Sequence, residues 1–194
     1  FVERSVANGI DIIRIFDCLN DLRNLQAAVD ATNKAKQQEG RGHAQIALSY
    51  TLGDAYTMDY WMKMAKDIEE MGADSICIKD MANLLLPYDA YSLVKKLKEK
   101  VKAPIHLHTH NTTGTGDMTY LMAVQAGVDI VDTALSPFAN GTAQPSTEAL
   151  VATLQGTEFD TGLDLNKLSD VAAHFRDVAN KMKAEGTLDP KVLN

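Results

Sequence analysis

Three histidines, His106, His108 and His110, alternate along one short segment of the sequence and could bind a metal ion. In a β-strand, side chains two residues apart point to the same face, so all three imidazoles would share a face. Two imidazoles about 7 Å apart along a strand can converge on one ion at nitrogen distances of about 2.1 Å. A single buried histidine is more often a satisfied core residue, but three in alternation at a strand end favour metal ligation. His106 lies deepest in the predicted strand, and we expect it to be a core residue or to support the ligands.

Lys79 follows the apolar residues 76–78 and ends another predicted strand. An ammonium group beside a divalent cation would be repelled, so a lysine at the metal must change its charge. It could be neutral, form a Schiff base, or add carbon dioxide to become a carbamate anion that ligates the metal. The alternative is a salt bridge to Asp80 or to another carboxylate.

Two further polar residues follow or end predicted strands. Arg14 could bind a substrate carboxylate through two hydrogen bonds, or form a buried ion pair with Asp17 or Asp54. Thr142 lies in the segment 140–145, and its hydroxyl could belong to the site, or the residue could simply form a turn. The spacing leaves both choices open.

Five short runs rich in β-branched residues predict the strands that position these side chains: 10–16, 44–50, 75–78, 105–109 and 128–134. Between them, apolar residues at helical spacing predict helices at 22–38, 58–71, 88–101 and 117–126. The alternation repeats about every 30 residues, the length of one βα unit in a parallel sheet. Gly9, Gly72 and Gly127 recur ahead of three of the strands, each two residues before an aspartate, and are expected to end helices.

Eight such units close a (β/α)8 barrel, in which polar residues at the carboxyl ends of the strands form the active site. Because five units cannot close a barrel, we expect an α/β fold that forms the C-terminal portion of a TIM (β/α)8 barrel over residues 1–155. The alternative is an open sheet, or a sheet that pairs with another chain. Residues 156–194 are expected to form a C-terminal helical extension. Helices are predicted at 147–154, capped by Ser146, and at 165–183, capped by Asp164 or Asn166. The chain begins at Phe1 within a helical pattern, which suggests a fragment that lacks about three N-terminal units.

The composition is that of a soluble globular protein, with 45% hydrophobic and 23% charged residues among 194. A net charge of -7 argues against nucleic acid and against an anionic membrane surface as partner. No apolar run approaches the roughly 20 residues of a spanning helix. The two cysteines, Cys18 and Cys77, show no pairing motif and suggest a reducing compartment, so we expect a cytoplasmic protein.

Four motifs occur in order along nearly the whole chain: GIDIIRIFDCLN at 9–20, IKDM at 78–81, HLHTHNTTG at 106–114 and GTAQPS at 141–146. Together they resemble the carboxyltransferase domain of the biotin-dependent pyruvate carboxylase, oxaloacetate decarboxylase α-subunit and transcarboxylase family. The sequence of residues 135–142 resembles the decarboxylase α-subunits more than the single-chain pyruvate carboxylases. The resemblance implies carboxyl transfer between carboxybiotin and pyruvate or oxaloacetate, as in an oxaloacetate decarboxylase α-subunit or the carboxyltransferase subunit of a pyruvate carboxylase.

The resemblance also implies a site. Zn2+, Co2+ or Mn2+ would be bound by His108, His110 and Lys79 as a carbamate, together with an aspartate in an Asp-x-x-Gln-Ser motif that this chain does not contain. Arg14 would bind the keto-acid carboxylate, Thr142 would shuttle a proton between biotin and the enolpyruvate oxygen, and Tyr50 would contribute at the mouth of the barrel.

The implied partners are a biotin carboxyl carrier domain or subunit, further copies of the chain in a homo-oligomer, and membrane subunits of a decarboxylase. Lys63 stands between two methionines, as a biotinylated lysine does, but it lies in a predicted helix rather than in a hairpin turn. The biotin is therefore expected on another domain. Two alternatives remain: an aldolase or acyl-CoA lyase or synthase of the related metal-dependent barrels, which would not carry the carbamylated lysine, and a catalytically silent fragment.

Overall fold

The computed structural model describes residues 1–189, and its centre is one parallel sheet of five strands in sequence order. The strands are β1 (Ile12–Asp17), β2 (His43–Ser49), β3 (Ser75–Asp80), β4 (Ile105–Thr109) and β5 (Ile130–Val131). Between them run α2 (Gln26–Glu39), α3 (Met58–Glu70), α4 (Pro87–Lys100) and α5 (Gly116–Gln125). Parallel strands in sequence order, each followed by a helix, form a sector of a (β/α)8 barrel. The predicted α/β fold of about five units is confirmed.

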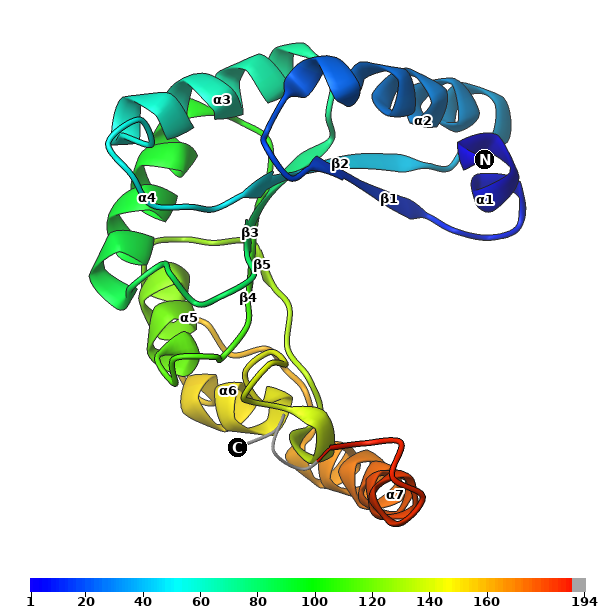
Figure 1. Cartoon of the computed structure of the whole chain (residues 1–194), viewed down its shortest axis with the longest axis vertical. Coiled ribbons are helices and arrows are strands. Elements are labelled where there is room, and N and C mark those ends of the chain that lie inside the picture. Colours follow the sequence, from blue (N-terminus) through cyan, green and yellow to red (C-terminus); the bar gives the residue numbers. More distant parts are fainter. Residues whose placement is uncertain (190–194) are drawn as a thin grey trace.

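The sheet is curved, and its helices lie on the outer, convex side (Figure 1). Alternate strand residues such as Ile46, Ile78 and Leu107 point to these helices and are completely buried in the hydrophobic core. The concave side carries the other half of each strand and has no helical layer in the described part of the chain (Figure 1). Its apolar residues Ile12 and Ile130 are therefore about half exposed, at 54% and 43%.

The predicted strands and helices agree with the structure to within a few residues, except at the two edges of the sheet. The strand expected at 10–16 begins at Ile12, and the strand expected at 128–134 is reduced to Ile130 and Val131. Each edge strand pairs with only one neighbour, so fewer ladder hydrogen bonds define its length. Beyond β5 the chain is held by an isolated bridge between Ala134 and Ser146.

The glycine and aspartate repeat fixes the amino ends of the strands. Gly72 and Gly127 have φ values of 88° and 91°, a left-handed conformation that favours glycine. Two residues later, Asp74 accepts a hydrogen bond from the backbone N–H of Ala44 and Asp129 from that of Ile105, at 2.9 and 2.7 Å. Each aspartate thus ties the start of its own strand to the start of the preceding one.

The remaining elements are α1 (Val2–Ala7), the short 3-10 helices η1 (Leu22–Asn24) and η2 (Ser136–Phe138), α6 (Thr147–Leu154) and α7 (Leu165–Ala184). The predicted caps are confirmed for α6 at Ser146 and for α7 at Asp164. The boundary between a barrel core at 1–155 and an extension at 156–194 stays a prediction, and residues 190–194 of that extension lie outside the described residues. Within residues 1–189 no helix is both long enough and apolar enough to span a membrane.

Candidate functional site

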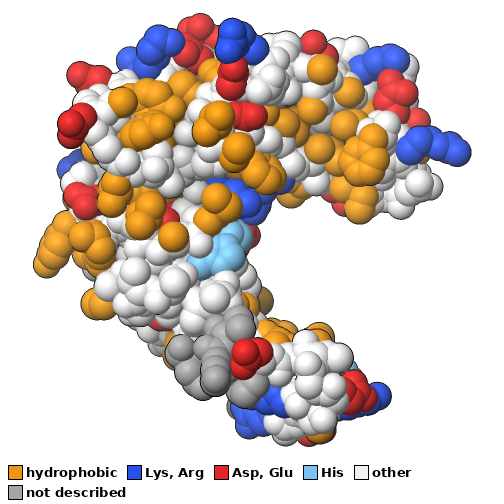
Figure 2. Space-filling view, in the orientation of Figure 1, with side chains coloured by type: hydrophobic (Ala, Val, Ile, Leu, Met, Phe, Trp, Pro, Cys, Tyr) orange, Lys and Arg blue, Asp and Glu red, His pale blue; other side chains and the backbone are white. Residues whose placement is uncertain are grey.

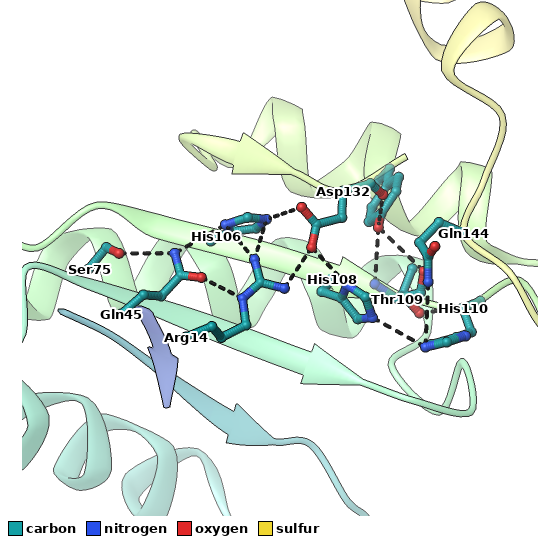
Figure 3. A network of polar contacts seen from close by, with 10 residues as sticks. Arg14, Gln45, Ser75, His106, His108, Thr109, His110, Asp132 and Gln144 are labelled. Carbon is teal, nitrogen blue, oxygen red and sulfur yellow. Dashed lines mark hydrogen bonds and ion pairs between the residues drawn. The ribbon is translucent and has the colours of Figure 1, made fainter. Parts of the chain in front are cut away.

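Polar side chains from neighbouring strands meet on the concave face of the sheet (Figure 3). The register pairs Lys79 on β3 with His108 on β4 and Cys77 with His106, so these four residues lie in two adjacent rows. Basic side chains and a histidine are visible at the middle of the hollow between the two arms of the molecule (Figure 2). The site is therefore built by the sheet itself and lies at the carboxyl half of its strands.

His108 and His110 point their Nε2 atoms at each other across 3.2 Å. The Nδ1 atom of each ring is bound to an oxygen: His108 contacts Asp132 Oδ2 at 2.7 Å, and His110 contacts the backbone carbonyl of Thr142. A carbonyl or an ionised carboxylate can only accept a hydrogen bond, so each Nδ1 must carry the proton. In the neutral rings both Nε2 atoms are then acceptors that face one another, and the Gln144 side-chain amide reaches the His110 Nε2 at 3.5 Å.

Two facing acceptors at this distance repel each other unless a positive charge lies between them. Two nitrogens that each bind one metal ion at about 2.1 Å lie about 3.0 to 3.4 Å apart for angles between roughly 90° and 109°. The observed 3.2 Å falls within that range. The donor set thus fits a divalent metal with two histidine ligands, although residues 1–189 contain no group of three His, Cys, Asp or Glu side chains that could hold one.

Lys79 lies at the same level of the sheet as His108, but its ammonium group lies over the ring of Phe16, 4.3 Å from the ring centroid. It forms no ion pair within the described residues. The expected alternative, a salt bridge to Asp80, is wrong because successive strand residues point to opposite faces. Asp80 is fully buried on the helix side, where it accepts hydrogen bonds from Leu84 N and Leu85 N at 2.9 Å.

Asp132, which follows β5, joins the histidine strand to Arg14 on β1. Its Oδ1 accepts from His106 Nε2 at 2.8 Å, and its Oδ2 accepts from Arg14 Nη1 at 2.8 Å as well as from His108. Burial would raise the pKa of Asp132, but the hydrogen bonds from His106, His108 and Arg14 outweigh it and hold the pKa far below its usual range. The carboxylate is therefore ionised.

Arg14 does not pair with Asp17 or Asp54, as one interpretation of the sequence expected. Its Nε donates to Gln45 Oε1 at 2.6 Å, Nη1 donates to Asp132, and Nη2 donates to His106 Nδ1 at 3.3 Å. The reason is its position: β1 continues to Asp17, so Arg14 lies inside the strand and its side chain crosses the concave face. A cavity of about 520 Å³ opens beside this group of side chains.

His106 is 6% exposed and accepts from Gln45 Nε2 at 3.2 Å on its Nδ1. Its Nε2 donates to Asp132, away from the other two histidines. The expected burial of His106 is confirmed, and its supporting role stays a prediction. Next to it, burial raises the pKa of the Cys77 thiol to about 12, so this cysteine stays protonated.

Two other predicted site residues are placed differently. Tyr50 packs its ring on Trp61 of α3, with centroids 5.3 Å apart, on the helix side of the sheet. Burial raises its pKa above the ordinary value. Thr142 is exposed in a turn that contains Asn140 and Gly141 at φ values of 70° and 58°. The structure gives its carbonyl a contact with His110, whereas the role of its hydroxyl stays a prediction.

The sequence interpretation missed Asp132 and Gln45. One signal was present for Asp132: it is a carboxylate two residues after Ile130 in an apolar run, which places it on the same face as Ile130. Gln45 is an amide within a strand of buried residues and is itself only 2% exposed. Neither observation predicts which side chains Asp132 and Gln45 contact, because those side chains are on other strands.

The fold and the two converging histidines define this chain as a sector of a (β/α)8 barrel with a candidate metal centre at the carboxyl ends of its strands. The model of the HMGL-like family matches residues 18–174, and the chain belongs to that family.

Among its relatives is a pyruvate carboxylase subunit of Methanocaldococcus jannaschii, which is 50% identical over 183 residues. That match covers 94% of this chain and 31% of the relative. The methylmalonyl-CoA carboxyltransferase 5S subunit of Propionibacterium freudenreichii is 40% identical over 185 residues, covering 94% of this chain and 36% of the relative. The chain thus spans about a third of the length of these relatives.

A solved structure gives the same result. The carboxyl transferase domain of Rhizobium etli pyruvate carboxylase, determined with oxamate and biotin, superposes with a TM-score of 0.87 at 37% identity. The match covers 92% of this chain and 30% of the other. The resemblance to the biotin-dependent carboxyltransferase family that the sequence motifs predicted is confirmed.

Proposed function

We propose that this chain forms part of the metal site of a biotin-dependent carboxyltransferase that acts on pyruvate or oxaloacetate. The observation that carries the proposal is the pair of facing Nε2 atoms of His108 and His110, held 3.2 Å apart with both Nδ1 atoms bound to oxygen. The similarity to a pyruvate carboxylase subunit and to a carboxyltransferase 5S subunit supports the reaction class.

His108, His110 and Lys79 as a carbamate would hold Zn2+, Co2+ or Mn2+. Lys79 is at the level of His108 on the adjacent strand, and carbamylation would replace the positive charge that now lies over Phe16 with a negative one. When bound, the metal would act as a Lewis acid that polarises the carbonyl group of the keto acid. An aspartate from another strand would complete the ligands.

Carboxyl transfer to pyruvate forms a bond between the carboxyl carbon and the methyl carbon of pyruvate and breaks the bond to N1 of biotin. A proton moves in the opposite direction, from the methyl group to N1. We assign this proton transfer to the hydroxyl of Thr142, which lies in the loop that contacts His110. Arg14 and Tyr50 stay candidates for substrate binding, but Arg14 is already bound to Asp132, and a keto-acid carboxylate would have to compete with it.

The biotin would be carried by a separate domain or subunit. Lys63 supports this assignment, because it lies in α3 and pairs with Asp67 rather than standing in a hairpin turn. A homo-oligomer, a cytoplasmic location and membrane subunits of an oxaloacetate decarboxylase remain part of the proposal. The similarity to a pyruvate carboxylase subunit and a carboxyltransferase subunit favours carboxyl transfer over the reaction of an aldolase or acyl-CoA lyase.

The test uses the intact enzyme, meaning this chain together with the strands that complete its barrel. His108→Ala and His110→Ala should each lose bound metal and oxaloacetate decarboxylation in the presence of free biotin. The loss should exceed the roughly 10- to 100-fold typical of residues that only support a ligand. His174→Ala is the matched control, because His174 is exposed on α7.

Full activity and metal content in both histidine variants would overturn the proposal. The 194-residue chain alone is expected to show little or no decarboxylation, and robust turnover by it would contradict the predicted need for a further metal ligand.

A further inference from the structure

We infer that Asp132 is a positioning residue whose carboxylate takes the Nδ1 hydrogen bond of His108 and so presents the His108 Nε2 lone pair to the metal. The inference rests on the metal site proposed above and assigns a role to a residue outside the ligand set. Figure 3 shows Asp132 between His106, His108 and the Arg14 guanidinium.

The hydrogen-bond pattern fixes the tautomers of the two neighbouring histidines in opposite senses. His106 Nδ1 accepts from Arg14 and from Gln45, so its proton must be on Nε2, which donates to Asp132 Oδ1. His108 donates from Nδ1 to Asp132 Oδ2, so its Nε2 is bare. One carboxylate therefore accepts from the two imidazoles through different ring nitrogens, and only His108 is left with a free lone pair.

Asp132 is itself held at both its backbone and its side chain. Its backbone N–H donates to the carbonyl of Leu107 at 3.2 Å, and its carbonyl accepts from the hydroxyl of the fully buried Tyr120. Arg14 Nη1 binds Oδ2, and Gln45 holds Arg14 from the other side. A carboxylate with this many contacts can hold an imidazole ring in one orientation, which is what a metal ligand requires.

The two candidate ligands differ in this support. His110 donates its Nδ1 proton to a neutral backbone carbonyl in an exposed turn, whereas the His108 side chain is 14% exposed and donates to an ionised carboxylate. A charged acceptor makes the stronger hydrogen bond and raises the basicity of the opposite nitrogen. His108 should therefore be the more firmly positioned of the two ligands.

Asp132→Asn in the intact enzyme tests the inference with little change of shape. The amide has only one acceptor oxygen, and that oxygen is neutral, so His108 loses the charged acceptor that holds its ring and raises the basicity of its Nε2. The dissociation constant for Co2+, measured by titration of its visible absorption, should rise about 10- to 100-fold. Asp129→Asn is the matched control, because Asp129 is three residues away and binds Lys98 and the Ile105 N–H but none of the histidines.

The imidazole 15N spectrum of the metal-free wild-type enzyme gives a readout that requires no stable variant. We expect the Nδ1–H tautomer at His108 and the Nε2–H tautomer at His106. An Nε2–H tautomer at His108, or unchanged Co2+ affinity in Asp132→Asn, would overturn the role of Asp132, while Co2+ binding by the wild-type enzyme would still support the metal site. A wild-type enzyme that binds no Co2+ would overturn the metal site itself, and the positioning role with it.

Discussion

Replacement of Arg14 by methionine separates a structural role of this arginine from a role in substrate binding. Methionine keeps a long unbranched side chain but removes the guanidinium group, and with it the hydrogen bonds to Gln45, Asp132 and His106 at 2.6, 2.8 and 3.3 Å. All three partners lie on the concave face, on three different strands or their ends. The substitution therefore removes the Arg14 hydrogen bonds that connect β1 to the rest of the site.

The expected cost follows from the burial of each partner. Gln45 is 2% exposed, and a buried acceptor left without its donor costs about 1 to 3 kcal/mol. Arg14 and Asp132 are 30% and 31% exposed, so water would partly replace the lost ion pair, which we count at no more than about 1 kcal/mol. We expect a loss of about 1 to 4 kcal/mol in the free energy of unfolding of this chain.

Urea unfolding of this chain and of the intact enzyme, with Arg176→Met on α7 as the exposed control, measures this loss. The Michaelis constant for oxaloacetate, measured on the intact enzyme, reports substrate binding. A loss below about 0.5 kcal/mol, the range of ordinary surface substitutions, together with a raised Michaelis constant would refute the structural role and favour binding of the keto-acid carboxylate by Arg14.

Three other predictions concern separate parts of the chain. Mass spectrometry of the intact enzyme under native conditions should find one carbon dioxide added to Lys79, and an unmodified lysine in a metal-loaded enzyme would favour the lyase alternative. Thr142→Ser should keep carboxyl transfer and Thr142→Val should lose it, so equal rates would remove the hydroxyl from the mechanism. Burial would raise the pKa of Asp74, but Lys36 and the Ala44 N–H lower it below the ordinary 3.8. The stabilising effect of the Asp74 carboxylate is thus present above about pH 4 and is lost as the pH falls through the lowered native pKa. Asp74→Asn should therefore be less stable than wild type at neutral pH and equally stable at low pH. Circular dichroism during an acid titration can check this.

The elements of this fold could be predicted because their signals are local. The caps Ser146 and Asp164 and the glycines before the strands act on residues close to them in sequence, and the structure has each of them in the expected role. The length of β5 could not be predicted in the same way. The pattern of residues 128–134 is that of a strand throughout, but a strand needs a partner for its whole length, and β4 supplies one for two residues only.

The residues of the site likewise include some that local sequence signals predict and some that they do not. His108 lies on β4, and His110 follows its last residue with its N–H still bound to the carbonyl of Asp80, so the convergence of the two histidines follows from the period of the strand. Arg14 and Asp132 are 118 residues apart in sequence, and only the curvature of the sheet brings them together. Spacing therefore offered Asp17 as a partner for Arg14, whereas Asp17 is used by the backbone N–H groups of Leu19 and Asp21.

The stability lost when the ion pair between Arg14 and Asp132 is broken depends on whether other strands cover the concave face. In the chain as described, water reaches both side chains, which keeps the effective dielectric constant high and the ion pair weak. Strands that complete a barrel would remove that water, and loss of one partner from a buried pair costs about 3 to 5 kcal/mol. Arg14→Met should therefore destabilise the intact enzyme more than it destabilises this chain. An equal loss in both would mean that the polar network on the concave face stays open to solvent in the assembled protein.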